Sequence, residues 1–142
     1  MSGDMRYLLD TDFISETRKL RPDPGVVSFL KSNDPDSGFI SVLTLGELRK
    51  GVAAKKLRDP DPHEAARLAA WVDGLESSFA DRILSIDTAT AKLWGEWSRE
   101  RPRPVVDAFL VATAVLNDLI LVTRNIRDVR GIPVKLLDPW RG

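Results

Sequence analysis

The sequence predicts an α/β protein, a three-layer sandwich with a central, mainly parallel sheet of about five short strands. Short apolar runs alternate along the chain with longer stretches in which apolar residues recur at helical spacing. The chain has 142 residues, close to the length of one domain, and 43% of them are hydrophobic, which suffices for a buried core. We therefore expect a single domain over residues 1–142.

Five apolar runs are expected to form the strands, because each is too short for a helix and is bounded by turn residues. The expected strands cover residues 7–9, 39–43, 83–86, 119–122 and 134–137. Such strands, separated by helices, run parallel in one sheet.

Helices are expected in the segments between these strands. They begin near residues 13, 25, 44, 65, 88 and 105. The stretch from residue 65 to 79 carries a single apolar stripe, which is typical of an amphipathic helix. Residues 105–116 are apolar on most sides, so this helix should be buried.

The composition excludes several kinds of chemistry. The chain has no cysteine, which excludes disulfides, thiolate catalysis and zinc ribbons, and its one histidine, His63, excludes a paired-histidine nuclease. Twenty-one basic residues balance 21 acidic ones, so a polyanion would have to meet a local basic surface. The remaining candidates for catalysis are carboxylates, together with the metals that prefer oxygen ligands.

Neither a membrane span nor a signal peptide is expected. No stretch approaches the roughly 20 apolar residues that a spanning helix needs, and the first residues lack a long apolar region. We expect the protein to lie in the cytoplasm.

Acidic and amide side chains follow several of the expected strands. Asp10 ends the first strand, Glu47 lies in the first turn of the helix after the second, and Asp107 lies near the start of the buried helix. Asn125 and Asp128 follow the fourth strand. Because ligands of parallel sheets gather beyond the carboxyl ends of the strands, these side chains could share one site.

Each of these residues also has a purely structural interpretation. Asp10 could be a turn residue, and Thr44 with Glu47 matches a capping box, in which Glu47 bonds back to the backbone. Asp107 could be a helix cap or a first-turn acid, and Asn125 could cap a short helical turn. Only their combination favours a site.

A cluster of carboxylates is stable when a cation lies between them, since their charges otherwise repel and raise their pKa values. Mg²⁺ and Mn²⁺ prefer oxygen ligands and assist hydrolysis at phosphorus. The pattern therefore indicates metal-assisted hydrolysis of a phosphoester.

Five sequence blocks occur in order along nearly the whole chain, at residues 7–16 (YLLDTDFISE), 40–48 (ISVLTLGEL), 107–114 (DAFLVATA), 121–128 (LVTRNIRD) and 138–140 (DPW). In these blocks the chain resembles the PIN-domain proteins, and specifically their VapC/FitB-like branch. The resemblance implies the PIN-like sandwich and a bacterial ribonuclease, the toxin of a type II toxin–antitoxin pair.

The resemblance also implies roles for particular residues. Asp10, Glu47 and Asp107 would form an acidic catalytic triad around Mg²⁺ or Mn²⁺. A metal-activated water would hydrolyse RNA phosphodiesters and leave 5′-phosphate and 3′-hydroxyl ends. Supporting hydroxyls would come from Thr11, Ser15 and Thr123.

Two positions depart from the family pattern. Asp12 stands where the family usually has asparagine, which adds negative charge near the metal. Asn125 stands where many members have a fourth acid, so it would ligate the metal through its amide oxygen without contributing charge. Asp128 could compensate for that missing charge.

The resemblance implies a VapB-like antitoxin as partner, a homodimer, and a transfer or ribosomal RNA as substrate. Basic residues that follow the same strand ends as the acids are the candidates for holding RNA: Arg18, Lys19, Arg21 and Arg124.

Two alternatives remain open at this point. The segment from Asp10 to Asp12 also fits a haloacid-dehalogenase-like phosphatase, with Asp10 as nucleophile and Asp12 as acid/base, although no lysine stands in a matching place. In the second alternative, Asn125 has weakened the metal site, and the protein binds a partner or RNA without cutting.

Overall fold

The computed structural model describes residues 5–58, 61–99, 104–125 and 131–141. Its centre is a five-stranded sheet in the order β3-β2-β1-β4-β5, and every neighbouring pair runs parallel. The strands are β1 (Tyr7–Leu9), β2 (Gly38–Ser41), β3 (Ile83–Leu84), β4 (Ile120–Val122) and β5 (Leu136–Leu137). The predicted fold class is confirmed.

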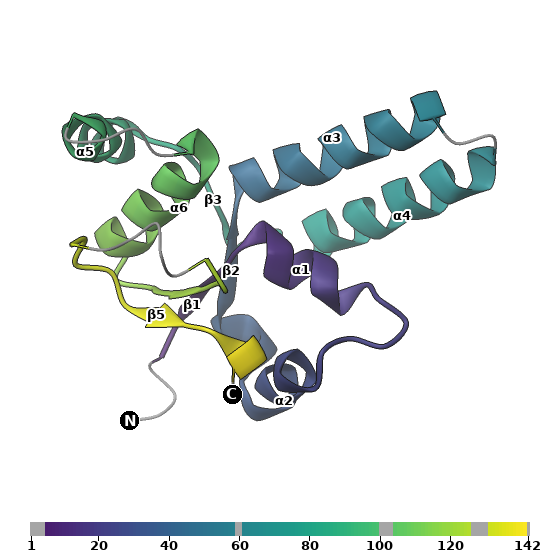
Figure 1. The fold of residues 1–142 in the computed structure, drawn as a ribbon, viewed down its shortest axis with the longest axis horizontal. Coiled ribbons are helices and arrows are strands. Elements are labelled where there is room, and N and C mark those ends of the chain that lie inside the picture. Colours follow the sequence, from purple (N-terminus) through teal and green to yellow (C-terminus); the bar gives the residue numbers. More distant parts are fainter. Residues whose placement is uncertain (1–4, 59–60, 100–103, 126–130, 142) are drawn as a thin grey trace.

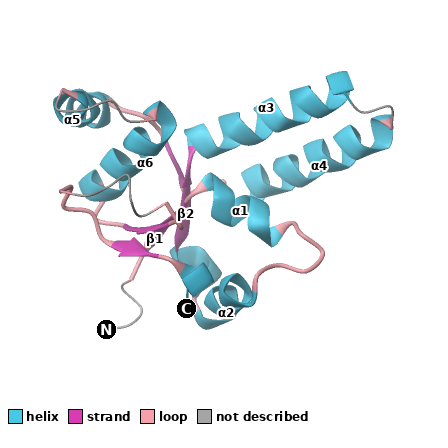
Figure 2. Cartoon of the chain, in the orientation of Figure 1, coloured by secondary structure: helices cyan, strands magenta, loops and turns pink. Residues whose placement is uncertain are grey.

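Helices cover both faces of this sheet, as a three-layer sandwich requires (Figures 1 and 2). The helices are α1 (Thr11–Thr17), α2 (Pro24–Ser32), α3 (Val42–Arg58), α4 (Pro62–Ser78), α5 (Thr88–Ser98) and α6 (Val105–Leu116), with short 3₁₀ helices η2 (Pro35–Ser37) and η4 (Pro139–Arg141). Helices α5 and α6 lie on one side of the sheet, and α1 to α4 lie on the other.

The direction of the strand order reverses at β1. From β1 the chain builds outward through β2 and β3, and it later returns to add β4 and β5 on the other side. The point between β1 and β4 is therefore a topological switch point, where loops leave the sheet in opposite directions and a crevice opens beyond the strand ends. Asp10 follows β1 and Thr123 follows β4 at this point.

Alternation along the strands divides the core into two clusters. Tyr7 and Leu9 of β1 pack with residues of α1 to α4, whereas Leu8 between them packs with Leu110 and Val111 of α6. Burial on both faces explains why the strands read as continuous apolar runs rather than as an alternating pattern.

Several expected element boundaries are wrong. The third strand stops at Leu84 rather than at residue 86, the fifth begins at Leu136 rather than at residue 134, and the helix expected from residue 65 begins at Pro62. The second strand stops at Ser41 rather than at residue 43, because the Ser41 hydroxyl accepts a hydrogen bond from the Leu43 backbone N–H at 3.0 Å and α3 begins at Val42. The first helix begins at Thr11, two residues early, because the Asp10 side chain caps it. Thr44 therefore lies inside α3, and the capping-box interpretation of Thr44 and Glu47 is wrong.

Helix α6 matches its predicted range. Pro104 precedes it without a side-chain cap, so the interpretation of Asp107 as the N-cap is wrong, while its placement in the first turn is confirmed. Asp128 and the turn that Asn125 was expected to cap lie outside the described residues. No helix in the described ranges is long and apolar enough to cross a membrane.

A close backbone approach joins α2 to the C-terminal 3₁₀ helix. A Cβ atom on Gly25 would lie 1.9 Å from the Pro139 carbonyl oxygen, a clash that no side-chain rotation can relieve.

We expect Gly25→Ala to lower the free energy of unfolding by about 2 kcal/mol or more, the scale of overpacking in a core. Gly74→Ala in α4 meets nothing within 4 Å and should instead stabilise the helix by about 0.5–1 kcal/mol. Urea unfolding of both variants measures the difference; equal effects would contradict the packing described.

Candidate active site

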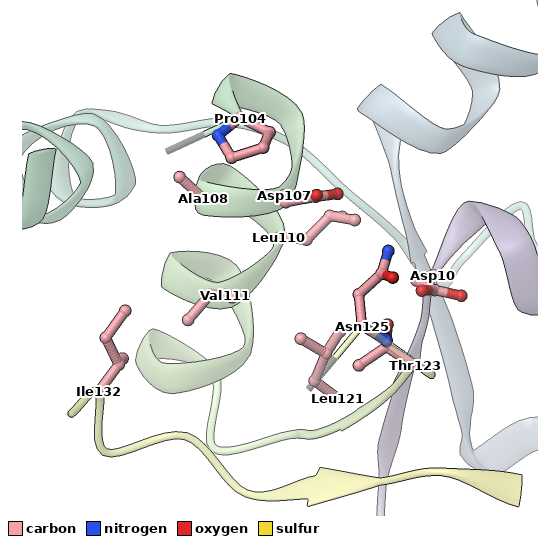
Figure 3. Close-up of a pocket in the computed structure, with 10 residues that line it drawn as sticks. All are labelled: Asp10, Pro104, Asp107, Ala108, Leu110, Val111, Leu121, Thr123, Asn125 and Ile132. Carbon is pink, nitrogen blue, oxygen red and sulfur yellow. Dashed lines mark hydrogen bonds between the residues drawn. The ribbon is translucent and has the colours of Figure 1, made fainter. Parts of the chain in front are cut away.

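A pocket opens at the switch point between β1 and β4. It is lined by Asp10 from the end of β1, Asp107 from the first turn of α6, and Thr123 and Asn125 from the segment after β4. Figure 3 shows the polar ends of these side chains gathered at one mouth of the pocket, above apolar residues such as Leu121. Three segments far apart in the sequence thus bring four oxygen-bearing side chains together.

Asp10 is the most constrained of these residues. Its side chain is buried, with 6% of the residue exposed, and Oδ1 accepts a hydrogen bond from the Phe13 backbone N–H at 2.8 Å. The Thr123 hydroxyl also hydrogen-bonds to it. The Asp10 backbone N–H continues the sheet by donating to the Val122 carbonyl at 3.2 Å. The carboxylate is therefore held by both strands of the switch point.

The pKa of Asp10 is raised to about 6, chiefly by burial, with smaller contributions from the negative charges of Asp12 and Asp107 and against the lowering effect of the hydrogen bonds from Thr123 and Phe13. A buried carboxylate beside two other carboxylates favours either a proton or a cation. Perturbation of this kind, in a pocket, is typical of functional sites.

Asp107 and Asn125 reach the same pocket from opposite sides. Asp107 lies on the first turn of α6, where the helix dipole favours a negative charge. Asn125 is fixed by its backbone, since its N–H donates to Thr123 Oγ1 at 3.0 Å. The Thr123 hydroxyl thus contacts both Asp10 and the Asn125 backbone.

Glu47 does not line this pocket. It lies in a neighbouring groove between α1, α3 and α4, together with Thr11 and Ser15. The Thr11 hydroxyl donates to Glu47 Oε1 and lies 3.1 Å from Thr44 Oγ1. Among the residues that the structure describes, no three histidine, cysteine, aspartate or glutamate side chains are grouped so that they could hold a metal ion. Of the three acids predicted to form a triad, Asp10 and Asp107 line one pocket, and Glu47 lies in the neighbouring groove, where it accepts a hydrogen bond from Thr11.

The predicted RNA-binding cations fall at two places. Arg18 and Lys19 line the groove that holds Glu47, and the Arg18 guanidinium lies 5.8 Å from the centre of the Trp71 ring. Arg21 is exposed in the loop after α1. Arg124 lies beside the pocket, where its Nε is 3.8 Å from Asp12 Oδ2.

Two residues near the site were missed by the sequence reasoning. Glu16 is a buried carboxylate that accepts from the Asp23 backbone N–H at 2.9 Å and pairs with Lys19 at 2.8 Å. The hydrogen bond from Lys19 lowers the pKa of Glu16. Trp140, treated only as part of a terminal motif, lies under the Arg124 guanidinium at 4.7 Å. Trp140 has no signal in local spacing, because its contact with Arg124 is tertiary, whereas Glu16 and Lys19 are three residues apart in the sequence.

Comparison with known protein families shows to which family the chain belongs. The family model described as PIN domain matches residues 7–131, which include all of the pocket except Ile132. The chain belongs to the PIN domain family.

Relatives of this PIN domain match it along almost its whole length. Toxin FitB of Neisseria gonorrhoeae is 29% identical over 138 residues, covering 94% of this chain and 97% of FitB. VapC ribonuclease Y4jK of Sinorhizobium fredii is 24% identical over 142 residues, covering 94% of this chain and 96% of Y4jK.

Solved structures share the fold. The crystal structure of FitAcB from Neisseria gonorrhoeae superposes with a TM-score of 0.83 at 27% identity, covering 96% of this chain and 99% of that one. A toxin–antitoxin complex from Klebsiella pneumoniae has a TM-score of 0.66 at 26% identity, covering 94% and 97% of the two chains.

Membership of the PIN family does not favour the phosphatase alternative, and the geometry agrees. A phosphatase would need Asp12 beside the reacting group of Asp10. Asp12 instead pairs with Arg124 and does not line the pocket.

The raised pKa of Asp10 predicts how stability changes with pH. Between pH 4 and 6 the unfolded chain releases a proton that folded Asp10 still holds, so stability should fall as pH rises through this window. In metal-free buffer, Asp10→Asn keeps the cap and removes the charge. We expect it to be more stable than wild type by a few kcal/mol at pH 7, at about 1.4 kcal/mol per pH unit.

Thermal unfolding of both proteins from pH 4 to 7.5, with EDTA present, measures this difference. Asp118→Asn, at the opposite end of α6, removes an exposed carboxylate and should show no such trend. A constant difference between Asp10→Asn and wild type across the range would contradict the assignment.

Proposed function

We propose that the protein is a metal-dependent endoribonuclease, the toxin of a bacterial type II toxin–antitoxin pair. The observation that carries the proposal is the convergence of Asp10, Asp107 and Asn125 on one pocket at the switch point of a PIN-domain sheet. Two relatives support it by name, FitB as a toxin and Y4jK as a VapC ribonuclease.

The donor set of the pocket suits Mg²⁺ or Mn²⁺. Mg²⁺ is usually held by one or two carboxylates and completes its shell with waters and substrate phosphates, so a third acid is not required. Asp10 and Asp107 would supply the carboxylates, Asn125 an amide oxygen, and Thr123 would orient Asp10. A cation bound there would neutralise charge on the phosphate and would lower the pKa of the attacking water.

The chain's own residues set the rest of the reaction. In hydrolysis, water adds its hydroxyl to phosphorus, the P–O3′ bond breaks, and the proton ends on O3′. Because water is the nucleophile, no side chain forms a covalent bond to the substrate. Asp10, with a pKa of about 6 before any cation binds, is ionised at neutral pH. Glu47 accepts a hydrogen bond from the Thr11 hydroxyl, and this bond fixes Thr11, the residue that follows Asp10, at the start of α1. Glu47 is thus proposed to act on the site through Thr11.

Cleavage of total transfer RNA by purified, antitoxin-free protein tests the proposal. We expect cuts with Mg²⁺ or Mn²⁺ and none with EDTA. Asp107→Asn should lower the rate by at least about 100-fold, because it removes one of two carboxylates from the site. Asp118→Asn, the matched change at the other end of α6, should keep the wild-type rate. Equal cleavage by wild type and Asp107→Asn would reject the assignment.

A folded wild-type protein that neither binds Mn²⁺ nor cuts RNA would favour the second alternative, a PIN domain with a weakened metal site that binds without cutting. Calorimetric titration with Mn²⁺ separates that outcome from a wrong choice of RNA, because ribosomal RNA can then be tried with a protein of known metal affinity.

The groove beside the pocket is the proposed RNA surface. It combines the cations of Arg18 and Lys19 with the ring of Trp71, so a backbone phosphate would meet positive charge close to the site. Lys19 shares its charge with Glu16, which leaves Arg18 as the stronger candidate.

Phosphate contact predicts salt-dependent binding. Arg18→Gln should weaken RNA binding and make the slope of log K against log salt shallower by about 0.7–0.9, the contribution of one phosphate contact. Lys135→Gln makes the same charge change at an exposed residue after the pocket segment and should leave the slope unchanged. Fluorescence anisotropy in EDTA, at several salt concentrations, gives the slope. Equal slopes for wild type and Arg18→Gln would remove Arg18 from the RNA surface.

A VapB-like antitoxin is the proposed protein partner, supported by the toxin–antitoxin complex from Klebsiella pneumoniae that shares this fold. A homodimer of the chain remains a prediction.

A further inference from the structure

Arg124 occupies a special place in the chain. It stands between Thr123, whose hydroxyl contacts Asp10, and Asn125, which lines the pocket. Thr123 is buried and Arg124 is exposed, so the two side chains leave the backbone toward different surroundings. Whatever fixes the Arg124 side chain therefore also fixes the backbone that carries the two pocket residues.

Three groups surround the Arg124 guanidinium. Asp12 Oδ2 lies 3.8 Å from Nε, and the positive charge of Arg124 contributes to lowering the pKa of Glu16. Asp12 and Glu16 are four residues apart on α1 and therefore share one face of that helix. The Trp140 ring covers the guanidinium at 4.7 Å. Arg124 thus lies between a two-carboxylate face of α1 and an aromatic ring of the C-terminal segment.

The Trp140 ring is itself held in place. Its backbone N–H donates to Asp138 Oδ1 at 3.0 Å, and its ring meets Phe13 edge-on at 6.2 Å. Pro139 lies against Gly25 with no room for a side chain. The C-terminal segment ends beside α2, as Figure 1 shows. Trp140 is therefore a fixed surface against which Arg124 is located.

These contacts are too weak to matter much for global stability. The side chains of Arg124 and Asp12 are each 49% exposed, and exposed ion pairs contribute roughly 0–1 kcal/mol. An exposed cation–π contact contributes about 0.5–1 kcal/mol. A position that carries two weak contacts beside the pocket is better explained by local geometry than by stability.

We infer that Arg124 is a positioning residue: it joins Asp12 to Trp140 and so holds the 123–125 turn, which sets the affinity of the pocket for a divalent cation. The inference rests on the proposed function, because it concerns the cation of that site. It also accounts for Asp12 where the family pattern has asparagine, since the added negative charge is paired with Arg124.

The sign of one effect distinguishes positioning from simple electrostatics. Removing a positive charge close to a cation site should tighten cation binding if charge alone matters. Loss of the positioning contact should weaken it. Arg124→Gln therefore has opposite expected effects under the two explanations.

The test is calorimetric titration of the full-length, metal-free protein with Mn²⁺. We expect Arg124→Gln and Trp140→Leu each to raise the Kd by about three- to tenfold, near the lower end of the effect of residues that orient metal ligands. Trp140→Phe should restore near-wild-type affinity because it keeps a ring under Arg124. Arg141→Gln, the same charge change on a residue that pairs with Asp138, should have no effect.

Unchanged or tighter Mn²⁺ binding by Arg124→Gln would overturn the inference. So would a variant that changes only the KM for RNA, since Arg124 would then be a substrate contact. Thermal unfolding should differ little between Arg124→Gln and wild type, which separates positioning from loss of fold.

Amide hydrogen exchange at Asn125 provides a readout that needs no metal. Its N–H donates to Thr123 Oγ1, so exchange should be faster in Arg124→Gln and unchanged in Arg141→Gln. If wild type binds no Mn²⁺, the metal site of the proposed function fails, and exchange alone still decides whether Arg124 holds the turn. Unchanged exchange at Asn125 would overturn the inference.

Discussion

The structure depends on one buried carboxylate at the switch point of the sheet. Asp10 caps α1 through Phe13, continues the β1–β4 pairing through its backbone, and meets the Thr123 hydroxyl from the neighbouring strand. Its burial raises its pKa to about 6, so ionising the carboxylate has a cost in folding free energy. A proton or a cation would remove that cost, so the residue that organises the local fold is also the one that most favours a ligand.

Topology explains why acids from distant segments meet. Parallel strands present their carboxyl ends at one edge, and the reversal of strand order between β1 and β4 opens the crevice there. Helix α6 crosses above that crevice and brings Asp107 to it in its first turn. Each acid, taken alone, could have a purely structural role in a turn or at the start of a helix. Only their convergence on one pocket favours a functional site.

Much of this could be predicted from the sequence. The strands could be predicted because strands that are buried on both faces form continuous apolar runs, and helix α6 because it is apolar on most sides. The residues at the carboxyl ends of the strands could be grouped because parallel strands end at the same edge of the sheet. The position of Glu47 could not be predicted, because Ser41 starts α3 early and Thr11 takes the Glu47 hydrogen bond. The contacts of Arg124 with Asp12 and Trp140 also could not be predicted from the sequence, because they depend on where the C-terminal segment ends.

The central claim is that Asp10 and Asp107 together hold a divalent cation. Anomalous diffraction from crystals of the full-length protein grown with Mn²⁺ tests it most directly, since the ion itself is located. We expect an anomalous peak in contact with carboxylate oxygens of both residues, and no such peak in crystals of Asp107→Asn. A peak only beside Glu47, or none in the pocket at saturating Mn²⁺, would contradict it.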